Sequence, residues 1–359
     1  MKIVTIVGAR PQFIKAAVVS REITKYPKIA EVIIHTGQHF DANMSDIFFK
    51  ELHIPASKYH LDIHSVGHGA MTGRMLEKIE ELLVIERPEF VIVYGDTNST
   101  LAGALAARKL QIKVIHIEAG LRSFNMTMPE EINRILTDRV SNILCCPTVQ
   151  AAENLRAEGF ANFNAAISVT GDVMQDAAIF YQKLAASNKG IISRLNIEGK
   201  EFALFTLHRA ENTDNVERLT EIIKAINQIA KEVDVIFPIH PRTRKIMLDQ
   251  GLSPFCKTID PVGYLDMVNL LLNCSIVLTD SGGLQKEAFF FKKTCVTLRD
   301  ETEWVELIEG KFNLLAGAIA EKIIAGFRTM RIAQPDFSRN LYGKGAAAKN
   351  ILSLLTGRG

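Results

Sequence analysis

The chain has 359 residues, and 42 lysines and arginines against 40 aspartates and glutamates leave a formal net charge of +2. This length exceeds the roughly 250–300 residues at which one hydrophobic core stops growing, so two domains are expected. A composition of 47% hydrophobic and 23% charged residues excludes general disorder. The near-neutral charge, without a block of basic residues, argues against nucleic acid as the main partner.

The sequence also argues against a membrane partner and a structural metal. No run of about 18 apolar residues occurs, and the N-terminal residues predict a strand instead of a signal peptide. The five cysteines lie in apolar surroundings without C-x-x-C spacing. We therefore interpret them as reduced core residues of a cytoplasmic protein and expect no metal site.

Short β-branched runs alternate with longer helical patterns in the first half of the chain. Strands that could be buried on both faces are predicted at residues 3–7, 31–35, 90–94, 113–117 and 142–146. Helical patterns lie between them, at residues 12–25, 45–52, 70–87, 99–110 and 129–141. This alternation predicts a Rossmann-like, doubly wound domain over residues 1–170.

The same alternation restarts in the second half. Strands are predicted at residues 203–206, 234–238, 257–259, 276–279 and 295–298, and helices at residues 216–231, 263–274 and 283–290. They form a second Rossmann-like domain over residues 171–341. Residues 342–359 contain a C-terminal helix, for which a return to the first domain is a candidate placement. The predicted fold class is thus α/β, with two doubly wound domains facing a central cleft where ligands bind.

Polar residues follow the predicted strands of the first domain. Gly8-Ala9-Arg10-Pro11 comes after the first strand, and Lys15 lies in the next helix. Arg10 and Lys15 could hold phosphate oxygens at that helix N-terminus, although two solvated basic residues would be the favoured explanation if the motif stood alone. The motif is neither G-x-G-x-x-G nor a P-loop, so a dinucleotide site is not indicated.

Acidic residues gather at the same predicted edge. Asp96 follows one strand in Gly95-Asp96-Thr97-Asn98-Ser99, where capping of the next helix explains the hydroxyl and amide but not the carboxylate. Glu118 follows the next strand. Glu130 and Glu131 begin a helix, and one of the two is expected to be structural because first-turn glutamates complement the helix dipole. Three carboxylates on one edge suit proton transfer.

The second domain supplies basic groups and a glycine turn at its own strand ends. His208 and Arg209 follow one strand, and His240 follows the next. Ser281-Gly282-Gly283 begins a helix whose backbone N–H groups could hold a diphosphate, with Glu287 one turn later to bind a ribose diol. The residues alone therefore predict a cleft that binds an anionic nucleotide mainly on domain two and performs acid/base chemistry from domain one.

In this order, the motifs resemble the family of non-hydrolysing UDP-N-acetylglucosamine 2-epimerases, relatives of the GT-B glycosyltransferases. The similarity extends from Gly8 through Gly95–Ser99, His116–Arg122 and Pro129–Arg134 to Asp280–Glu287. By this resemblance UDP is held by Arg10, Lys15, His208, Arg209, His240, Ser281, Gly282, Gly283 and Glu287. The catalytic residues that it implies are Asp96, Glu118, Glu130 and His208.

The resemblance implies elimination and re-addition. A base removes the C2 proton while UDP leaves C1, the intermediate is reprotonated on its other face, and UDP adds back. No cofactor is needed for this chemistry, and basic residues stabilise the charge that develops on the diphosphate. Which carboxylate is the base stays open, with Asp96 and Glu118 considered before Glu130. The resemblance also implies a homodimer and a role in surface polysaccharide synthesis.

Three departures from the family pattern concern substrate and regulation. Phe40-Asp41-Ala42-Asn43 replaces a segment that relatives use for an activating nucleotide, so hyperbolic saturation is expected. Lys286 stands where a second glutamate is usual, and Trp304 stands where relatives have arginine. These features resemble the branch that acts on UDP-2,3-diacetamido-2,3-dideoxy-glucuronic acid. The alternatives are a solvated Lys286 on the outer face of its helix and a Trp304 that only packs in the core.

Three rival functions fit the same sequence. A GT-B glycosyltransferase would need an acceptor groove, and a hydrolysing epimerase would release UDP and free sugar. A non-catalytic nucleotide-sugar sensor would keep the basic residues without needing the carboxylates. Incubation with a UDP-sugar alone separates an epimerase from a transferase, since only the transferase needs an acceptor.

Overall fold

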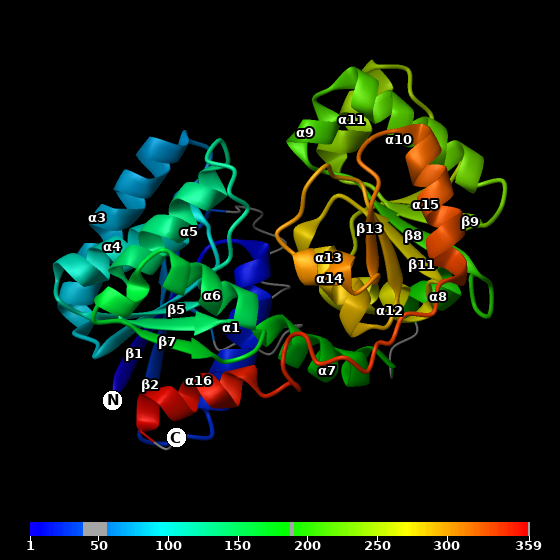
Figure 1. The fold of residues 1–359 in the computed structure, drawn as a ribbon. Coiled ribbons are helices and arrows are strands. Elements are labelled where there is room, and N and C mark those ends of the chain that lie inside the picture. Colours follow the sequence, from blue (N-terminus) through cyan, green and yellow to red (C-terminus); the bar gives the residue numbers. More distant parts are fainter. Residues whose placement is uncertain (39–55, 187–189, 358–359) are drawn as a thin grey trace. The chain divides into compact units, whose positions relative to one another are not determined.

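The computed structural model describes residues 1–38, 56–186 and 190–357 of the chain. The predicted helix at residues 45–52 and the divergent segment at residues 40–43 lie outside these ranges. The chain forms two compact units. The first comprises Met1–Ala177 and Asn340–Gly359, and the second comprises Ala178–Arg339. Both units are drawn in Figure 1, where the colour follows the sequence.

The first unit is built around a parallel sheet with the strand order of a doubly wound fold. In spatial order its strands are β3 (Tyr59–His60), β2 (Ala30–His35), β1 (Lys2–Val7), β4 (Phe90–Tyr94), β5 (Lys113–Ile117), β6 (Ile143–Cys146) and β7 (Ala166–Val169). The order reverses between β1 and β4, so the turns after these two strands flank the point where ligands of such sheets bind.

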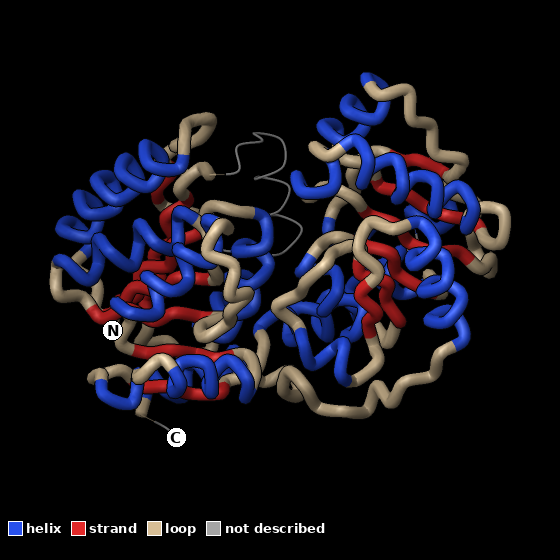
Figure 2. The backbone as a smooth tube through the Cα atoms, turned by 45° about the horizontal axis from the view of Figure 1, so that its top comes forward, coloured by secondary structure: helices blue, strands red, loops and turns tan. Residues whose placement is uncertain are grey.

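Helices cover this first sheet, as the tube view in Figure 2 shows. They are α1 (Arg10–Ile23), α3 (His68–Glu86), α4 (Asn98–Lys109), α5 (Pro129–Val140), α6 (Val149–Ala157), the start of α7 (Val173–Ala186) and α16 (Ala347–Thr356). Five small residues of α4 are buried and let it pack between α3 and α5: Ala102, Gly103, Ala104, Ala106 and Ala107.

The C-terminal helix α16 packs against α1 within the first unit. Its first turn is held by Asp176 of α7, whose carboxylate accepts hydrogen bonds from the backbone nitrogens of Ala347 at 3.1 Å and Ala348 at 2.9 Å. A carboxylate at this position satisfies helix N–H groups that would otherwise lack partners. The end of the chain is therefore a structural part of the first unit.

The second unit repeats the same topology. Its parallel sheet contains, in spatial order, β10 (Lys257–Ile259), β9 (Asp234–Pro238), β8 (Phe202–Thr206), β11 (Ile276–Thr279), β12 (Thr294–Thr297) and β13 (Asn313–Leu315). The reversal falls between β8 and β11. Its helices are α8 (Gly190–Arg194), α9 (Ala210–Thr213), α10 (Val216–Ile229), α11 (Pro241–Asp249), α12 (Tyr264–Asn273), α13 (Gly282–Phe290), α14 (Val305–Glu309) and α15 (Ala320–Ile332).

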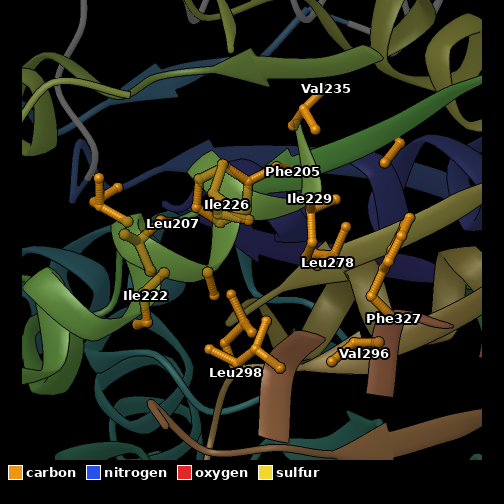
Figure 3. Close-up of a cluster of buried hydrophobic side chains, with 14 of the residues drawn as sticks. Phe205, Leu207, Ile222, Ile226, Ile229, Val235, Leu278, Val296, Leu298 and Phe327 are labelled. Atoms are coloured by element: carbon orange, nitrogen blue, oxygen red, sulfur yellow. The ribbon is translucent and has the colours of Figure 1, made fainter. Parts of the chain in front are cut away.

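The core of the second unit explains why α10 forms where it does. Apolar residues at helical spacing, including Ile222, Ile226 and Ile229, pack beside Phe205 of β8 and Phe327 of α15 (Figure 3). Each fully buried side chain of this size stabilises the fold by about 1.5–3 kcal/mol relative to an exposed one. The prediction of a doubly wound α/β fold is confirmed in both units.

The cysteines are unpaired, and four of the five are buried. Burial raises the pKa of the Cys145 thiol to about 12 and that of Cys256 to about 11. These thiols are therefore protonated and unreactive at neutral pH. In the parts of the chain that the structure describes, no helix is long and apolar enough to cross a membrane.

Candidate active site

Gln12 organises the edge of the first sheet at the strand-order reversal. Its side-chain oxygen accepts hydrogen bonds from the backbone nitrogens of Gly8 and Ala9, at 2.8 and 3.1 Å. Its amide nitrogen donates to the carbonyl oxygen of Tyr94 at 2.8 Å and to the Thr97 hydroxyl at 2.9 Å. One buried amide thus joins the turn after β1 to the turn after β4.

Gly8 is required at this edge by the close approach of two hydroxyl groups. A Cβ atom there would lie 2.0 Å from the Thr36 hydroxyl and 2.2 Å from the Ser99 hydroxyl. These two hydroxyls hydrogen-bond each other at 2.8 Å, and Ser99 also donates to Gln38 at 2.8 Å. The turns after β1, β2 and β4 are therefore packed together.

Two predicted catalytic carboxylates lie at this edge, each paired with a cation. Lys15 of α1 forms an ion pair with Glu118, which follows β5, and both side chains are largely buried. Arg134 of α5 forms an ion pair with Asp96, which follows β4. A Cβ atom on Gly95 would lie 3.2 Å from Glu118 and 3.3 Å from the Lys15 ammonium. The structure thus brings Lys15, Glu118 and the Asp96 turn together.

The two glutamates at the start of α5 have different environments. Glu131 is buried, and its carboxylate accepts hydrogen bonds from the backbone nitrogens of Ser123 and Phe124, at 3.0 and 2.9 Å, and from Arg134 at 3.0 Å. Glu130 is partly exposed, and no hydrogen bond or ion pair of its side chain is found among the described residues. Glu131 therefore has the structural position, which leaves Glu130 available to a ligand.

Of the remaining residues predicted in the first unit, Arg10 is the first residue of α1. Its backbone lies directly after the Gly8-Ala9 turn, at the point of strand-order reversal.

In the second unit, Asp280 holds the backbone that carries two predicted UDP ligands. This carboxylate follows β11, is fully buried, and accepts hydrogen bonds from the backbone nitrogens of His208 at 3.0 Å and Arg209 at 2.8 Å. Thr206 and Thr279, the last residues of β8 and β11, hydrogen-bond each other at 2.6 Å. These hydrogen bonds connect the two turns at the second strand-order reversal. The His208 side chain itself is about half exposed.

The Ser281-Gly282-Gly283 turn begins α13 as predicted. Ser281 is the N-cap residue, and its hydroxyl accepts a hydrogen bond from the Leu284 nitrogen at 3.4 Å. A Cβ atom on Gly283 would meet only the Ser281 hydroxyl, at 4.0 Å, so the space beside this glycine is open. Glu287 is buried one turn into the helix. This arrangement suits an anion at the helix N-terminus.

His240 lies apart from that turn, after β9. It is the N-cap residue of α11, and its Nδ1 accepts a hydrogen bond from the Arg242 nitrogen at 3.3 Å. The residues of the first unit and those of the second belong to separate compact units.

The divergent residues of the second unit form one buried cluster. The Lys286 ammonium lies 4.0 Å from the ring centroid of Trp304, and both side chains are almost fully buried. Arg299, also buried, donates to Glu303 at 2.9 Å. A Cβ atom on Gly282 would lie 2.5 Å from Glu303 and 3.6 Å from Trp304 Nε1. The alternative of a solvated Lys286 is therefore wrong, because its helix face packs inward against this cluster.

Sequence reasoning missed Gln12, the role of Asp280, and the role of Asp138 on α5, whose carboxylate lies 2.7 Å from His116 Nδ1 and accepts a hydrogen bond from the Gly120 nitrogen. No local pattern indicated Gln12, because its helix has Ala9 at the N-cap, where a capping box has Ser or Thr. The hydrogen bonds to the two aspartates link residues distant in sequence, and no local pattern indicates them. Within the described residues, no group of three or more His, Cys, Asp or Glu side chains could hold a metal ion.

Two doubly wound sheets, with polar turns at their strand-order reversals and a serine-capped helix N-terminus, define the class of nucleotide-binding α/β proteins. Comparison with known proteins places the chain within that class. The family model described as UDP-N-acetylglucosamine 2-epimerase matches residues 21–356. The chain belongs to this UDP-N-acetylglucosamine 2-epimerase family, and its relatives are epimerases that act on UDP-sugars.

Individual relatives are similar along nearly their whole length. The UDP-2,3-diacetamido-2,3-dideoxy-D-glucuronate 2-epimerase of Pseudomonas aeruginosa is 56% identical over 356 residues, which cover 99% of each chain. The Methanocaldococcus jannaschii UDP-GlcNAc 2-epimerase, solved with UDP-GlcNAc and UDP, has a TM-score of 0.92 at 44% identity and covers 99% of this chain and 100% of that one. The Neisseria meningitidis enzyme bound to UDP-GlcNAc has a TM-score of 0.89 at 31% identity, with coverage of 99% and 100%.

Proposed function

We propose that the protein is a non-hydrolysing UDP-sugar 2-epimerase that inverts C2 of a UDP-2-acetamido sugar. The observation that carries this proposal is the 56% identity, over 99% of both chains, to an enzyme named for C2 epimerisation of a UDP-diacetamido sugar. The carboxylates at the edge of the first sheet supply the acid/base groups that such chemistry requires. The expected biological role is surface polysaccharide synthesis.

The catalytic step is proposed as elimination followed by re-addition. A carboxylate takes the C2 proton, the C2–H electron pair forms the C1–C2 double bond, and the C1–O bond breaks as UDP leaves. An acid then returns a proton to the opposite face of C2, and the diphosphate oxygen re-forms its bond to C1. Asp96, Glu118 and Glu130 are the proposed acid/base set. Asp96 follows β4, Glu118 follows β5, and Glu130 lies in the first turn of α5, so all three are expected at one edge of the sheet.

The proposed nucleotide ligands divide between the two units. Arg10 and Lys15 in the first unit, and His208, Arg209, His240, Ser281, Gly282, Gly283 and Glu287 in the second, are the proposed contacts to UDP. The N-terminus of α13 and its serine cap support a diphosphate there, because helix N-termini attract anions. His208 is proposed to act also in catalysis, since its exposed imidazole follows the turn locked by Asp280.

For the sugar, we propose a 2,3-diacetamido uronic acid in preference to N-acetylglucosamine. The buried cluster of Lys286, Arg299, Glu303 and Trp304 lies against Gly282, next to the proposed diphosphate turn. Of its two buried cations, Arg299 is paired with Glu303, whereas Lys286 lies over the Trp304 ring and is the group proposed to bind a sugar carboxylate. The substrate named for the Pseudomonas aeruginosa relative supports the same choice. The measurement is kcat/KM for the two UDP-sugars, and a clear preference for UDP-N-acetylglucosamine would reject the uronic acid.

The activity is tested by incubating the purified protein with each UDP-sugar alone and following the sugar protons by NMR. The proposal predicts the C2 epimer of the UDP-sugar, with no acceptor and no added cofactor. Release of UDP with free sugar would indicate a hydrolysing epimerase. A UDP-sugar that stays unchanged when incubated alone, and is consumed only after an acceptor is added, would indicate a glycosyltransferase.

We also propose a homodimer that works in the cytoplasm. Ile132 and Leu136, one turn apart on α5, remain exposed, as do Phe124 and Met126 in the preceding loop. Exposed apolar side chains such as these could be covered by a second copy of the chain. The unpaired cysteines fit a reducing compartment. Light scattering on a gel-filtration column measures the assembly, and a monomer at micromolar concentration would reject the dimer.

A further inference from the structure

Beneath the edge that carries the proposed catalytic carboxylates lies a fully buried histidine. His116 of β5 is hydrogen-bonded through both ring nitrogens: Nδ1 lies 2.7 Å from a carboxylate oxygen of Asp138, and Nε2 lies 2.7 Å from the carbonyl oxygen of Gly95. A carboxylate and a carbonyl can only accept hydrogen bonds. Both contacts are therefore satisfied only if each ring nitrogen carries a hydrogen, which makes the ring an imidazolium.

The charged group that touches His116 is the Asp138 carboxylate. Arg122 donates to Asp138 at 2.7 Å and binds both carboxylate oxygens of Glu158, at 2.6 and 2.8 Å. Glu158 is partly exposed, whereas Arg122 and Asp138 are buried. The Asp138 carboxylate, 2.7 Å from Nδ1, favours a hydrogen on that ring nitrogen. The neighbouring thiol of Cys145 is uncharged at neutral pH, because burial raises its pKa to about 12.

Asp138 connects three segments through this network. It lies on α5, its Oδ1 faces His116, and its Oδ2 accepts a hydrogen bond from the Gly120 nitrogen at 3.2 Å. His116 extends the connection to Gly95. A single carboxylate thus joins α5, the turn after β5 and the turn after β4. These are the segments that carry Glu130, Glu118 and Asp96, in that order.

The turns held by the network have backbone conformations that need support. Gly95, Glu118 and Gly120 all have left-handed φ angles, of 63°, 72° and 79°. A left-handed conformation costs a non-glycine residue such as Glu118 on the order of 1 kcal/mol or more, and it persists only where surrounding contacts enforce it. The hydrogen bond between His116 and the Gly95 carbonyl, and the hydrogen bond from the Gly120 nitrogen to Asp138, provide such contacts.

We propose that His116, as a buried imidazolium, and Asp138 are positioning residues that hold Asp96 and Glu118 in the geometry needed for proton transfer at C2. Neither residue touches the reacting atoms. The role in turnover rests on the epimerase function proposed above, whereas the protonation of His116 is a property of the protein alone. The two parts are therefore measured separately.

The protonation is tested by NMR on the unmodified chain labelled with ¹⁵N-histidine. The His116 signals are assigned by comparison with His116→Gln, or by backbone correlation if that variant does not fold. We expect both ring nitrogens to carry hydrogens at neutral pH, with and without UDP. One protonated and one unprotonated nitrogen, the pattern of a neutral ring, would overturn the imidazolium assignment.

The positioning role is tested with Asp138→Asn, with Asp176→Asn as the matched control. Asp176 is also a carboxylate of the first unit that accepts two backbone N–H groups, but it caps α16 instead of joining the catalytic turns. Asp138→Asn should lower kcat by about 10²-fold with UDP affinity and KM within about threefold of the parent, whereas Asp176→Asn should leave kcat within about threefold.

A folded Asp138→Asn protein with parental kcat would overturn the positioning role. Equal losses of kcat in both variants would overturn it too, because they would reflect general destabilisation. If the parent protein has no epimerase activity, the proposed function fails, and the NMR result still decides the state of His116.

Discussion

Lys15 and Glu118 form a buried ion pair that joins helix α1 to the turn after strand β5. Sequence reasoning assigned Lys15 to the phosphates of UDP and Glu118 to proton transfer. The pairing places these two functions on adjacent groups. A diphosphate that draws the Lys15 ammonium toward itself would release the Glu118 carboxylate, so nucleotide binding and the availability of the base would be linked.

Replacing one member of this pair should destabilise the first unit. Lys15→Ala removes the lysine cation paired with the largely buried Glu118 carboxylate, which should lower the free energy of unfolding by about 3–5 kcal/mol. UDP affinity should fall as well. The double variant Lys15→Ala/Glu118→Ala should recover much of the stability. Urea unfolding measures both, and a single variant as stable as the parent would show that the pair is not energetically coupled.

The neighbours Glu130 and Glu131 should separate activity from stability. Glu130→Gln should lower kcat by about 10²-fold or more while leaving the unfolding midpoint nearly unchanged, because its side chain supports no part of the fold. Glu131→Gln should lower the free energy of unfolding by about 2 kcal/mol, since its carboxylate anchors the loop at Ser123 and Phe124. Steady-state kinetics and urea unfolding of both variants provide the comparison. A loss of stability in Glu130→Gln together with a loss of only kcat in Glu131→Gln would mean that Glu131 is the catalytic residue and Glu130 the structural one.

The cluster around Trp304 should determine which sugar is preferred. In the parent protein the Lys286 cation lies over the Trp304 ring. The double change Lys286→Glu/Trp304→Arg puts an anion at position 286 and a cation at position 304. It should lower kcat/KM for the UDP-diacetamido uronic acid by about 10-fold or more, because a cation suited to the sugar carboxylate is lost. The value for UDP-N-acetylglucosamine should change less. A uniform loss for both sugars would mean that the cluster only supports the fold.

Part of the free energy of unfolding should depend on the ionisation of Glu86 and should therefore be lost in acid. Hydrogen bonds from Lys58, then Tyr59 and Lys2, lower the pKa of its carboxyl to about 2 from an ordinary value of 4.5. A lowered carboxyl pKa stabilises the fold above the unfolded value, and this contribution is lost as the pH falls from about 4.5 toward 2. Glu86→Gln should therefore be less stable than the parent at pH 7, with a difference that shrinks near pH 2. Urea midpoints at both values test this, and a constant difference would contradict it.

The fold was largely predictable because its central strands are continuous apolar runs. Residues 3–7 and 91–94 are buried on both faces, a pattern that is typical of a parallel sheet covered by helices. The edge strands β3, β7 and β13 were missed, since they are two to four residues long and only partly buried. Seven helices were also not predicted: α6, α7, α8, α9, α11, α14 and α15. The confirmed elements are thus those whose apolar residues follow a strand or helix spacing most clearly.

The site was predictable where residues follow a strand directly. Asp96 and Glu118 lie at the ends of β4 and β5 as expected, because parallel strands end at one edge. Their partners were not predictable. The ion pairs with Arg134 and Lys15, and the hydrogen bonds of Asp138, depend on helix packing that brings distant residues together. The proposed roles of the site residues remain predictions for the experiments described.

Deuterium incorporation tests the central claim most directly. The purified protein is incubated with its UDP-sugar in D₂O without added cofactor, and the C2 proton is followed by NMR. Because carboxylates exchange their proton with solvent, the account predicts that every epimerised sugar carries deuterium at C2, and that Asp96→Asn and Glu118→Gln slow this incorporation by about 10²-fold or more. Epimerisation with full retention of the original C2 hydrogen would contradict proton abstraction by these residues.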